Sequence, residues 1–297
     1  QNHFDLPVDA LCILRTDHPH YYRGKQGDES ETEFVDRIVG NLEAMIVREG
    51  PETIAAFIAE PITGASGVIV PPEGYYQKVQ AVLNRYGIMF WADEVITGFG
   101  RTGNDFGCTT MAIESPDMMT FAKQLSSAYM PISASAIRRE MYDAMIEQSA
   151  SAGAFGHGYT YSGHPVACAV ALKTLEIYQR DKIFEKAAVS GAYLQKRLAE
   201  FADHPLVGEV RGSGLIGALE LVANKETGEP FVGGAVGGYA QKMAQDNGLL
   251  IRTVAGSCLG FCPPLIITNE QIDEMIEKVA PALDATLDHC KKENLLR

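Results

Sequence analysis

The sequence has no apolar run long enough for a membrane-spanning helix, which would need about 18 consecutive apolar residues. Basic residues are also scarce, since 25 Lys and Arg stand against 38 Asp and Glu and give a formal net charge of −13. Because nucleic-acid binding depends on clustered Lys and Arg, this balance argues against a nucleic-acid partner. We therefore expect a globular protein that binds neither membrane nor nucleic acid.

Paired cysteines at zinc-binding spacing are also absent. Of the six cysteines only Cys258 and Cys262 are close in sequence, and C-x-x-x-C without a second pair is not a zinc pattern. His157 and His164 have no acid or cysteine at ligand spacing, so we expect no metal site. The simplest interpretation is free thiols in a reducing cytosol, and no secretory signal is recognisable, so a cytoplasmic location is predicted.

The first half of the chain alternates between strand-like and helix-like segments. Apolar residues at helical spacing predict helices over residues 31–48 and 76–86, and short apolar runs predict strands over residues 53–59, 88–92 and 118–122. This rhythm is typical of βαβ units. The fold class is therefore predicted as α/β, with a mostly parallel central sheet flanked by helices.

The second half has a different pattern. A helix is expected from His164 to about Tyr178, followed by strands over residues 214–221 and 249–253 and a last helix that opens with a capping box at Thr268. The glycine-rich residues 228–238 are expected to be flexible. We therefore predict a large domain over residues 1–179 and a smaller α/β domain over residues 180–297.

Three reactive side chains follow the predicted strands of the first half. Glu60, Asp93 and Lys123 each stand at or just past a strand end. Because parallel strands with right-handed crossovers end at one edge of a sheet, where ligands bind in open α/β sheets, these side chains are expected to lie close together. An acid that keeps a pyridine nitrogen protonated and a lysine that forms an imine are what pyridoxal phosphate requires of a protein.

A competing motif occurs in the same region, because residues 98–103 match G-x-G-x-x-G after a strand. A dinucleotide-binding loop would open a helix within the glycines, whereas Asn104 to Gly107 continue as a turn. The carboxylates of Asp93 and Glu94 would also repel a pyrophosphate. We therefore reject this motif as a nucleotide site.

Four motifs together resemble the class III aminotransferases, which are pyridoxal-phosphate enzymes of fold type I. They are ADEVITGFGRTG at 92–103, TFAK at 120–123, HGYTYSGHP at 157–165 and CPPLIIT at 262–268. The resemblance covers nearly the whole chain and is closest to the branch that moves amino groups from amines or omega-amino acids to pyruvate. It also implies that the family's N-terminal portion, with its phosphate loop and a ring-stacking aromatic residue, lies outside this sequence.

The resemblance implies roles for the residues at the strand ends. Lys123 would hold the cofactor as an internal aldimine and carry a proton in a ping-pong reaction, and Asp93 would pair with the pyridine nitrogen. Val95 would press on the ring. On sequence alone Lys123 could instead be a solvated surface lysine, Asp93 a turn cap and Val95 a core valine.

Further roles concern the substrate and a partner subunit. The resemblance places Glu60 near the cofactor and substrate, and Arg252 as a movable arginine that holds a substrate carboxylate. Tyr159 and Thr160 would reach the cofactor phosphate of a neighbouring subunit, which implies a homodimer with a shared active site; a tetramer stays open as an alternative. An acid that caps a loop and an arginine that ends a strand are the alternatives for Glu60 and Arg252.

Position 96 departs from part of the family. The acetylornithine, ornithine and 4-aminobutyrate branches usually have glutamine where this chain has Ile96, which cannot hydrogen-bond the cofactor. The predicted function is therefore pyridoxal-phosphate-dependent transfer of an amino group from an amine or omega-amino acid to a keto acid such as pyruvate. An acetylornithine or 4-aminobutyrate aminotransferase, an aminomutase, a decarboxylase or an inactive truncated scaffold stays open.

Overall fold

The computed structural model describes residues 13–297, so Cys12, one of the six predicted free thiols, lies outside the described residues. The other five cysteines are free thiols.

The chain divides into two compact units, a first unit of Gln1–Ala56 with Pro71–Ile88 and a second unit of Phe57–Val70 with Met89–Arg297. The predicted domain boundary between residues 179 and 180 stays a prediction. No helix within residues 13–297 combines the length and apolar character that a membrane crossing requires.

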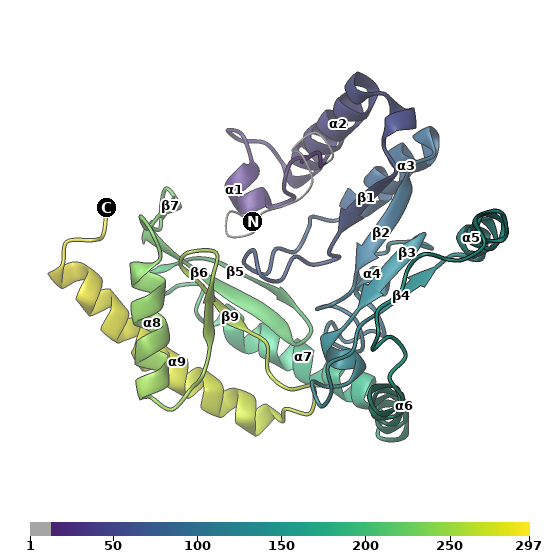
Figure 1. Cartoon of the computed structure of the whole chain (residues 1–297). Helices are drawn as coiled ribbons and strands as arrows, with labels where there is room; N and C mark the ends of the chain where they lie inside the picture. The colour runs from purple at the N-terminus through teal and green to yellow at the C-terminus, as the bar shows by residue number, and fades with distance from the viewer. Residues whose placement is uncertain (1–12) are drawn as a thin grey trace. The chain divides into compact units, whose positions relative to one another are not determined.

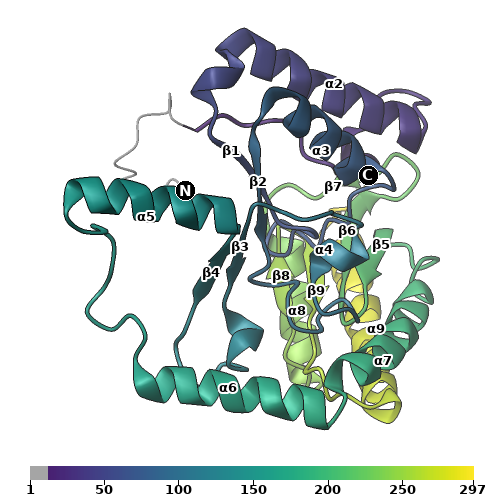
Figure 2. The ribbon, with the colours of Figure 1, turned by 90° about the vertical axis from the view of Figure 1, so that its right-hand side faces the viewer.

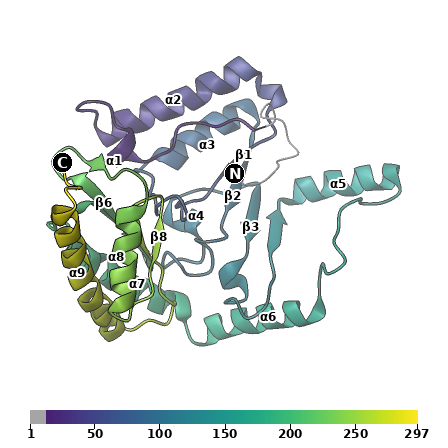
Figure 3. The ribbon, with the colours of Figure 1, turned by 60° about the vertical axis from the view of Figure 1, so that its left-hand side comes forward.

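The first unit is helical. Its elements are α1 (Tyr21–Gly24), α2 (Glu31–Glu49), the 3-10 helix η2 (Pro51–Thr53) and α3 (Tyr75–Tyr86), and Figure 3 shows α3 running beside α2. A capping box between Ser30 and Glu33 starts α2, and Gly50 caps its end. Gly87, in the left-handed conformation, ends α3. Both helices predicted in this part of the chain are confirmed.

The second unit contains a four-stranded mixed sheet. Its strands lie in the order β1 (Ala56–Ala59), β2 (Met89–Asp93), β3 (Met118–Phe121) and β4 (Ala134–Ile137). β2 and β3 pair in parallel, whereas β3 and β4 pair antiparallel. The three strands predicted at residues 53–59, 88–92 and 118–122 are confirmed, the first and third with shorter bounds and the second shifted by one residue. The antiparallel β4 was not predicted.

Four helical segments accompany this sheet, namely α4 (Gly107–Thr110), the 3-10 helix η3 (Lys123–Leu125), α5 (Arg139–Ala152) and α6 (Pro165–Arg180). The helix predicted from His164 is α6, with His164 as its N-cap residue. Figure 2 and Figure 3 both show α5 and α6 at opposite ends of β4, joined by an extended segment. α5 has no buried residue, which explains why the pattern of buried apolar residues did not reveal it.

A second sheet in this unit is antiparallel. Its strands are β5 (Val207–Ser213), β6 (Ile216–Asn224), β9 (Cys258–Phe261) and β8 (Arg252–Val254) in spatial order, with β7 (Glu229–Pro230) also paired to β6. The helices that go with it are α7 (Ile183–Ala199), α8 (Ala235–Asp246) and α9 (Asn269–Lys292). Figure 1 shows α8 and α9 next to each other beside these strands.

The main hydrophobic core lies between this sheet and its helices, and Leu194, Leu219 and Leu283 are fully buried within it. The capping box of Thr268 and Gln271 starts α9 as predicted. The predicted buried stripe of α9 is also confirmed, and it consists of Ile272, Ile276, Val279 and Leu283.

Three expectations for the second half need correction. The strand predicted from residue 214 begins at Ile216, because Gly214 adopts φ +57° in the turn between β5 and β6. The strand predicted over residues 249–253 is present only from Arg252 onward. The glycine-rich residues 228–238 contain β7 and the start of α8, whose first turn buries Val236 and Gly237.

Candidate active site

The ends of β2 and β3 place Asp93 and Lys123 at one edge of the mixed sheet. Asp93 is the last residue of β2 and lies opposite Thr120 of the parallel strand β3. β3 ends at Phe121, and Lys123 opens the 3-10 helix η3 directly after it. Parallel pairing therefore brings the two residues to the same edge, as the sequence led us to expect.

Asp93 is held by the turn that follows its strand. One carboxylate oxygen, Oδ1, accepts a hydrogen bond of 3.0 Å from the backbone N–H of Val95. The other oxygen accepts no hydrogen bond from the residues that the structure describes. The half-buried carboxylate thus has a fixed orientation and one oxygen left for a ligand's proton donor.

Glu94, the neighbour of Asp93, anchors the same turn from inside. Its side chain is 1% exposed and accepts hydrogen bonds from the backbone N–H groups of Gly107 and Cys108, at 2.9 and 2.7 Å. The hydroxyl of Thr97 donates to the same carboxylate at 2.5 Å. These bonds connect the end of β2 to the start of α4 and so limit the movement of Asp93.

Glu60 follows β1 and interacts with both other site residues. Its carboxylate accepts a hydrogen bond of 2.9 Å from the backbone N–H of Gly64. Burial raises the pKa of Glu60 above its ordinary value, while the Gly64 N–H acts in the opposite direction. The charge of Asp93 also raises this pKa and that of Lys123 lowers it. Three residues distant in sequence thus share one electrostatic environment.

Lys123 lies on an exposed turn with an unusual backbone. Its φ is +39°, a conformation that costs free energy for any residue with a Cβ atom. Its ammonium group makes no hydrogen bond or ion pair with any residue in the described part of the chain. The amine is therefore available to a ligand at the sheet edge.

Ile96 supports the loop that holds Glu60. A Cβ atom added to Gly64 would lie 2.3 Å from Cδ1 of Ile96, so a larger residue here would require the Ile96 side chain to move. Ile96 also packs against a small buried cluster that includes Ile62 and Val68. The sequence indicated only that Ile96 cannot hydrogen-bond the cofactor. The structure shows that its side chain also packs against this cluster.

Arg252, Tyr159 and Thr160 come from other elements of the chain and are exposed. Arg252 starts β8, is exposed and makes no hydrogen bond or ion pair with the described residues, Glu60 included. Tyr159, which is 77% exposed, and Thr160 belong to a fully exposed segment, where the N–H of Tyr159 donates to Ser162 at 3.1 Å. Their predicted roles toward a substrate or a neighbouring subunit stay predictions, as does the role of Val95.

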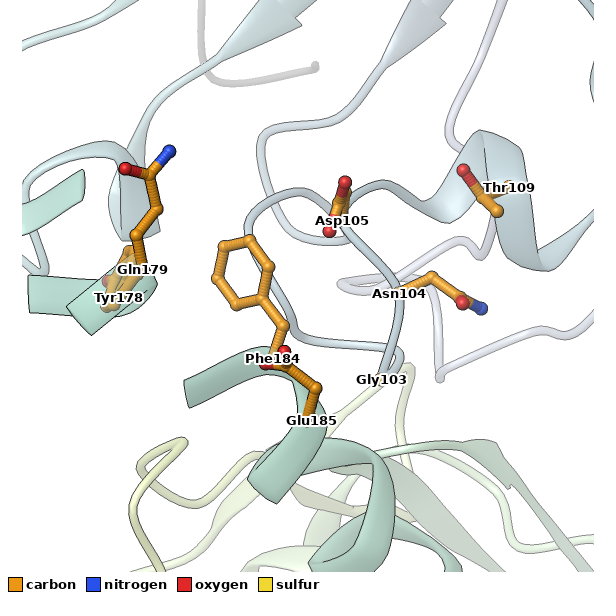
Figure 4. Close-up of a pocket in the computed structure, with 8 residues that line it drawn as sticks. All are labelled: Gly103, Asn104, Asp105, Thr109, Tyr178, Gln179, Phe184 and Glu185. Carbon is orange, nitrogen blue, oxygen red and sulfur yellow. The ribbon is translucent and has the colours of Figure 1, made fainter. Parts of the chain in front are cut away.

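A cavity of about 530 Å³ lies behind the turn that carries Lys123, and Figure 4 shows Phe184 projecting into it between Gln179 and the loop of Asn104 and Asp105. None of Lys123, Asp93 and Glu60 lines this cavity. Tyr178 lines it and also bonds to the backbone next to Lys123. The cavity is therefore adjacent to the site and separate from it.

The rejected dinucleotide motif also has a structural explanation. Residues 98–105 form successive turns, and the next helix begins only at Gly107. Arg101 in this loop donates to the carbonyl oxygens of Leu215 and Pro263, at 2.9 and 2.6 Å. The loop therefore connects parts of the second unit and offers no helix N-terminus within its glycines.

A family model described as aminotransferase class-III matches residues 13–283 of this chain. The chain belongs to the class-III aminotransferase family. Its fold is accordingly that of fold type I, with a mixed sheet flanked by helices, as the sequence predicted.

Individual relatives are similar over nearly all of this class-III chain. It is 49% identical over 284 residues to the "Gamma aminobutyrate transaminase 3, chloroplastic" of Solanum lycopersicum, covering 95% of this chain and 54% of that protein. It is 49% identical over 288 residues to a probable mitochondrial gamma-aminobutyrate transaminase 3 of Oryza sativa subsp. indica, covering 95% and 55%. The chain thus spans about half the length of the curated relatives it matches.

Solved structures give the same result. A structure described as "Transaminase with L-ala" superposes with a TM-score of 0.93 at 49% identity, covering 96% of this chain and 67% of the other. The omega transaminase from Pseudomonas jessenii in complex with PMP superposes with a TM-score of 0.93 at 47% identity, covering 97% and 63%.

Two residues near the site were not predicted as functional. Glu94 was not singled out because its partners, Gly107 and Cys108, are distant in sequence. Tyr178 was named only as the approximate end of a predicted helix, because nothing in the sequence shows where its hydroxyl points.

Proposed function

We propose that this protein transfers amino groups with pyridoxal 5'-phosphate as cofactor, taking them from an amine or omega-amino acid and giving them to a keto acid such as pyruvate. The observation that carries the proposal is the shared position of Lys123, Asp93 and Glu60 at the ends of neighbouring strands. Membership of the class-III family supports it.

The donor groups of the site fit this cofactor. Asp93 has one carboxylate oxygen fixed by Val95 and one oxygen left for a protonated ring nitrogen. Lys123 offers an exposed primary amine, which an aldehyde requires. When bound, pyridoxal phosphate withdraws electrons from the substrate carbon that loses its proton.

The side chains of the chain then perform three tasks. Asp93 keeps a proton on the pyridine nitrogen, because a carboxylate beside it stabilises the positive charge. The Nζ atom of Lys123 holds the cofactor at rest and accepts and returns the proton of the substrate carbon during each half of the reaction. Glu60 is half-buried at the same edge and contributes a carboxylate whose charge depends on its neighbours.

The substrates and the assembly are part of this proposal. The names of the relatives, gamma-aminobutyrate transaminase and omega transaminase, support an amine or omega-amino acid as donor. Arg252 is proposed to hold a substrate carboxylate through its two parallel N–H groups. We further propose a homodimer in which Tyr159 and Thr160 contribute to the neighbouring site, located in the cytoplasm.

Single-turnover stoichiometry tests the proposal against other class-III chemistry. With a donor amine and no keto acid, an aminotransferase releases at most one equivalent of aldehyde or ketone per site, and added pyruvate restores turnover. A decarboxylase or an aminomutase continues to form product without the keto acid. A protein that binds no cofactor and releases no product under either condition would contradict the proposal and favour the scaffold alternative.

A further inference from the structure

The turn that carries Lys123, residues 123–128, has a strained backbone. Lys123, Ser127 and Ala128 have φ values of +39°, +49° and +62°, and each has a Cβ atom that disfavours this conformation. The N–H groups of Ser126 and Ala128 both donate to the carbonyl oxygen of Lys123, over long distances of 3.3 Å. Two shorter bonds also hold the turn, from the Leu125 N–H to the carbonyl oxygen of Ala122 at 2.8 Å and from the Ser126 hydroxyl to that of Met130 at 2.7 Å. The strain at three positions nevertheless leaves a role for support from outside the turn.

Tyr178 supplies that support from the last turn of α6. Its hydroxyl donates to the carbonyl oxygen of Gln124 at 2.9 Å and lies 2.7 Å from the hydroxyl of Ser127. A carbonyl oxygen can only accept, so the single proton of Tyr178 goes to Gln124 and the hydroxyl of Ser127 donates to Tyr178. One phenol oxygen thus bridges two positions of the turn.

Tyr178 is itself fixed in place. Its side chain is 7% exposed, and its ring packs against Phe184 with 5.3 Å between ring centroids. Burial raises the pKa of Tyr178, so the hydroxyl keeps the proton that it donates to Gln124. A rigid, buried donor that hydrogen-bonds to a strained turn beside a reactive lysine fixes the orientation of that turn.

We infer that Tyr178 is a positioning residue that holds the Lys123 turn in the orientation in which the amine meets the cofactor. The effect of Tyr178 on the reaction of Lys123 rests on the proposed function. The contact between Tyr178 and the turn does not, and it can be tested without any cofactor. Because the Tyr178 hydroxyl bonds to the carbonyl oxygen of Gln124 and to the Ser127 hydroxyl, it acts through the turn and not on the reacting atoms.

The first test uses the full chain without cofactor. Tyr178→Phe removes the hydroxyl and keeps the ring against Phe184. We expect amide hydrogen exchange of residues 125–128 to accelerate about three- to tenfold relative to exchange of the core around Leu219, as the loss of one or two hydrogen bonds implies. Tyr193→Phe is the matched control, since the hydroxyl of Tyr193 donates to Asp273 at 2.8 Å and has no contact with the turn.

The second test measures how fast Lys123 reacts with added pyridoxal phosphate, followed by absorbance and fixed with borohydride. Tyr178→Phe should slow this reaction about three- to tenfold, Ser127→Ala should have a smaller effect, and Tyr193→Phe should leave the rate unchanged. If Tyr178→Phe speeds amide exchange but leaves the reaction rate of Lys123 unchanged, Tyr178 has only a structural role and the inference is overturned. Unchanged amide exchange in Tyr178→Phe would also overturn it. If Lys123 of the wild type takes no label, the proposed function fails, and the exchange data alone decide whether Tyr178 holds the turn.

Discussion

The two sheets of the second unit differ in how completely their side chains are buried. β6 is buried from Ile216 to Ala223, whereas no residue of β3 or β4 is fully buried. The strained turn of Lys123 follows β3. In the antiparallel sheet nearly every apolar side chain therefore contributes to stability, while the edge of the mixed sheet presents polar groups to a ligand.

This difference separates residues that hold the fold from residues that perform chemistry. A variant of Lys123 or Asp93 at the sheet edge should change activity and leave stability nearly unchanged, whereas the half-buried Glu60 should add a pH-dependent change in stability. A variant in the antiparallel sheet should do the reverse. The following variants test that separation, beginning with the largest expected effect.

Lys123→Ala should have the largest effect on activity. We expect both half-reactions, from the donor amine and from the keto acid, to slow at least about 1,000-fold, because one amine holds the cofactor and moves the proton in each. Rapid-mixing measurements of each half-reaction and a thermal unfolding curve test this. Lys173→Ala is the control, because Lys173 is an exposed lysine of α6 paired with Glu176. A loss confined to one half-reaction would contradict a shared role.

Leu219→Ala should have the largest effect on stability. Leu219 lies in the centre of β6 with 0% of its surface exposed, so truncation leaves a cavity in the main core. We expect a loss of about 2–5 kcal/mol in the free energy of unfolding, measured with urea. Leu250→Ala, at a position 84% exposed, should change it by less than about 0.5 kcal/mol. Equal losses of unfolding free energy in the two variants would contradict the expected difference between the buried sheet and the surface.

Asp93→Asn should lower activity by a smaller factor than loss of Lys123. Asparagine still accepts the hydrogen bond from Val95, so the turn is kept, but the negative charge toward the cofactor is removed. We expect kcat/KM to fall about ten- to 100-fold, with a free energy of unfolding within about 0.5 kcal/mol of the wild type. Asp181→Asn, at a surface carboxylate paired with Arg180, should match the wild type. Full activity of Asp93→Asn would contradict the proposed role of this carboxylate toward the cofactor.

Glu60→Gln should have the smallest effect, and it depends on pH. Because burial raises the pKa of Glu60 above 4.5, the folded state binds this proton more readily than the unfolded state. The stability from Glu60 is therefore full below pH 4.5 and is lost as the pH rises through the folded-state pKa. Glutamine cannot ionise and still accepts from Gly64.

Urea midpoints of the wild type and Glu60→Gln, compared from about pH 4 to pH 8, should therefore diverge, with the variant more stable at the upper end. Glu147→Gln, at an exposed position of α5, should follow the wild type throughout. Parallel curves for wild type and Glu60→Gln would show that burial does not perturb Glu60.

The sequence predicted those parts of the fold in which local pattern and burial agree. α2, α3 and α9 have apolar faces at helical spacing and clear caps, so both their presence and their ends could be read. α5 has no buried face, and β4 pairs in a direction that no local pattern specifies. These elements depend on contacts that only the folded chain reveals.

The candidate site was predictable to the extent that strand ends determine position. The strand rhythm places Asp93 and Lys123 at one edge, and the structure does so as well. Most of the bonds that hold them are not visible in the sequence, because Glu94 bonds to backbone N–H groups 13 and 14 residues away and Tyr178 to a carbonyl oxygen 54 residues away along the chain. The assigned roles of Arg252, Tyr159 and Thr160 depend on a substrate or a second subunit, so they stay predictions.

Covalent labelling tests the central claim most directly. The protein is incubated with pyridoxal phosphate, treated with borohydride and digested, and the labelled peptide is identified by mass spectrometry. We predict a single label on Lys123 that depends on Asp93, with far weaker labelling in Asp93→Asn. A label spread over surface lysines, or absent from Lys123, would contradict the assignment of this strand edge as the cofactor site.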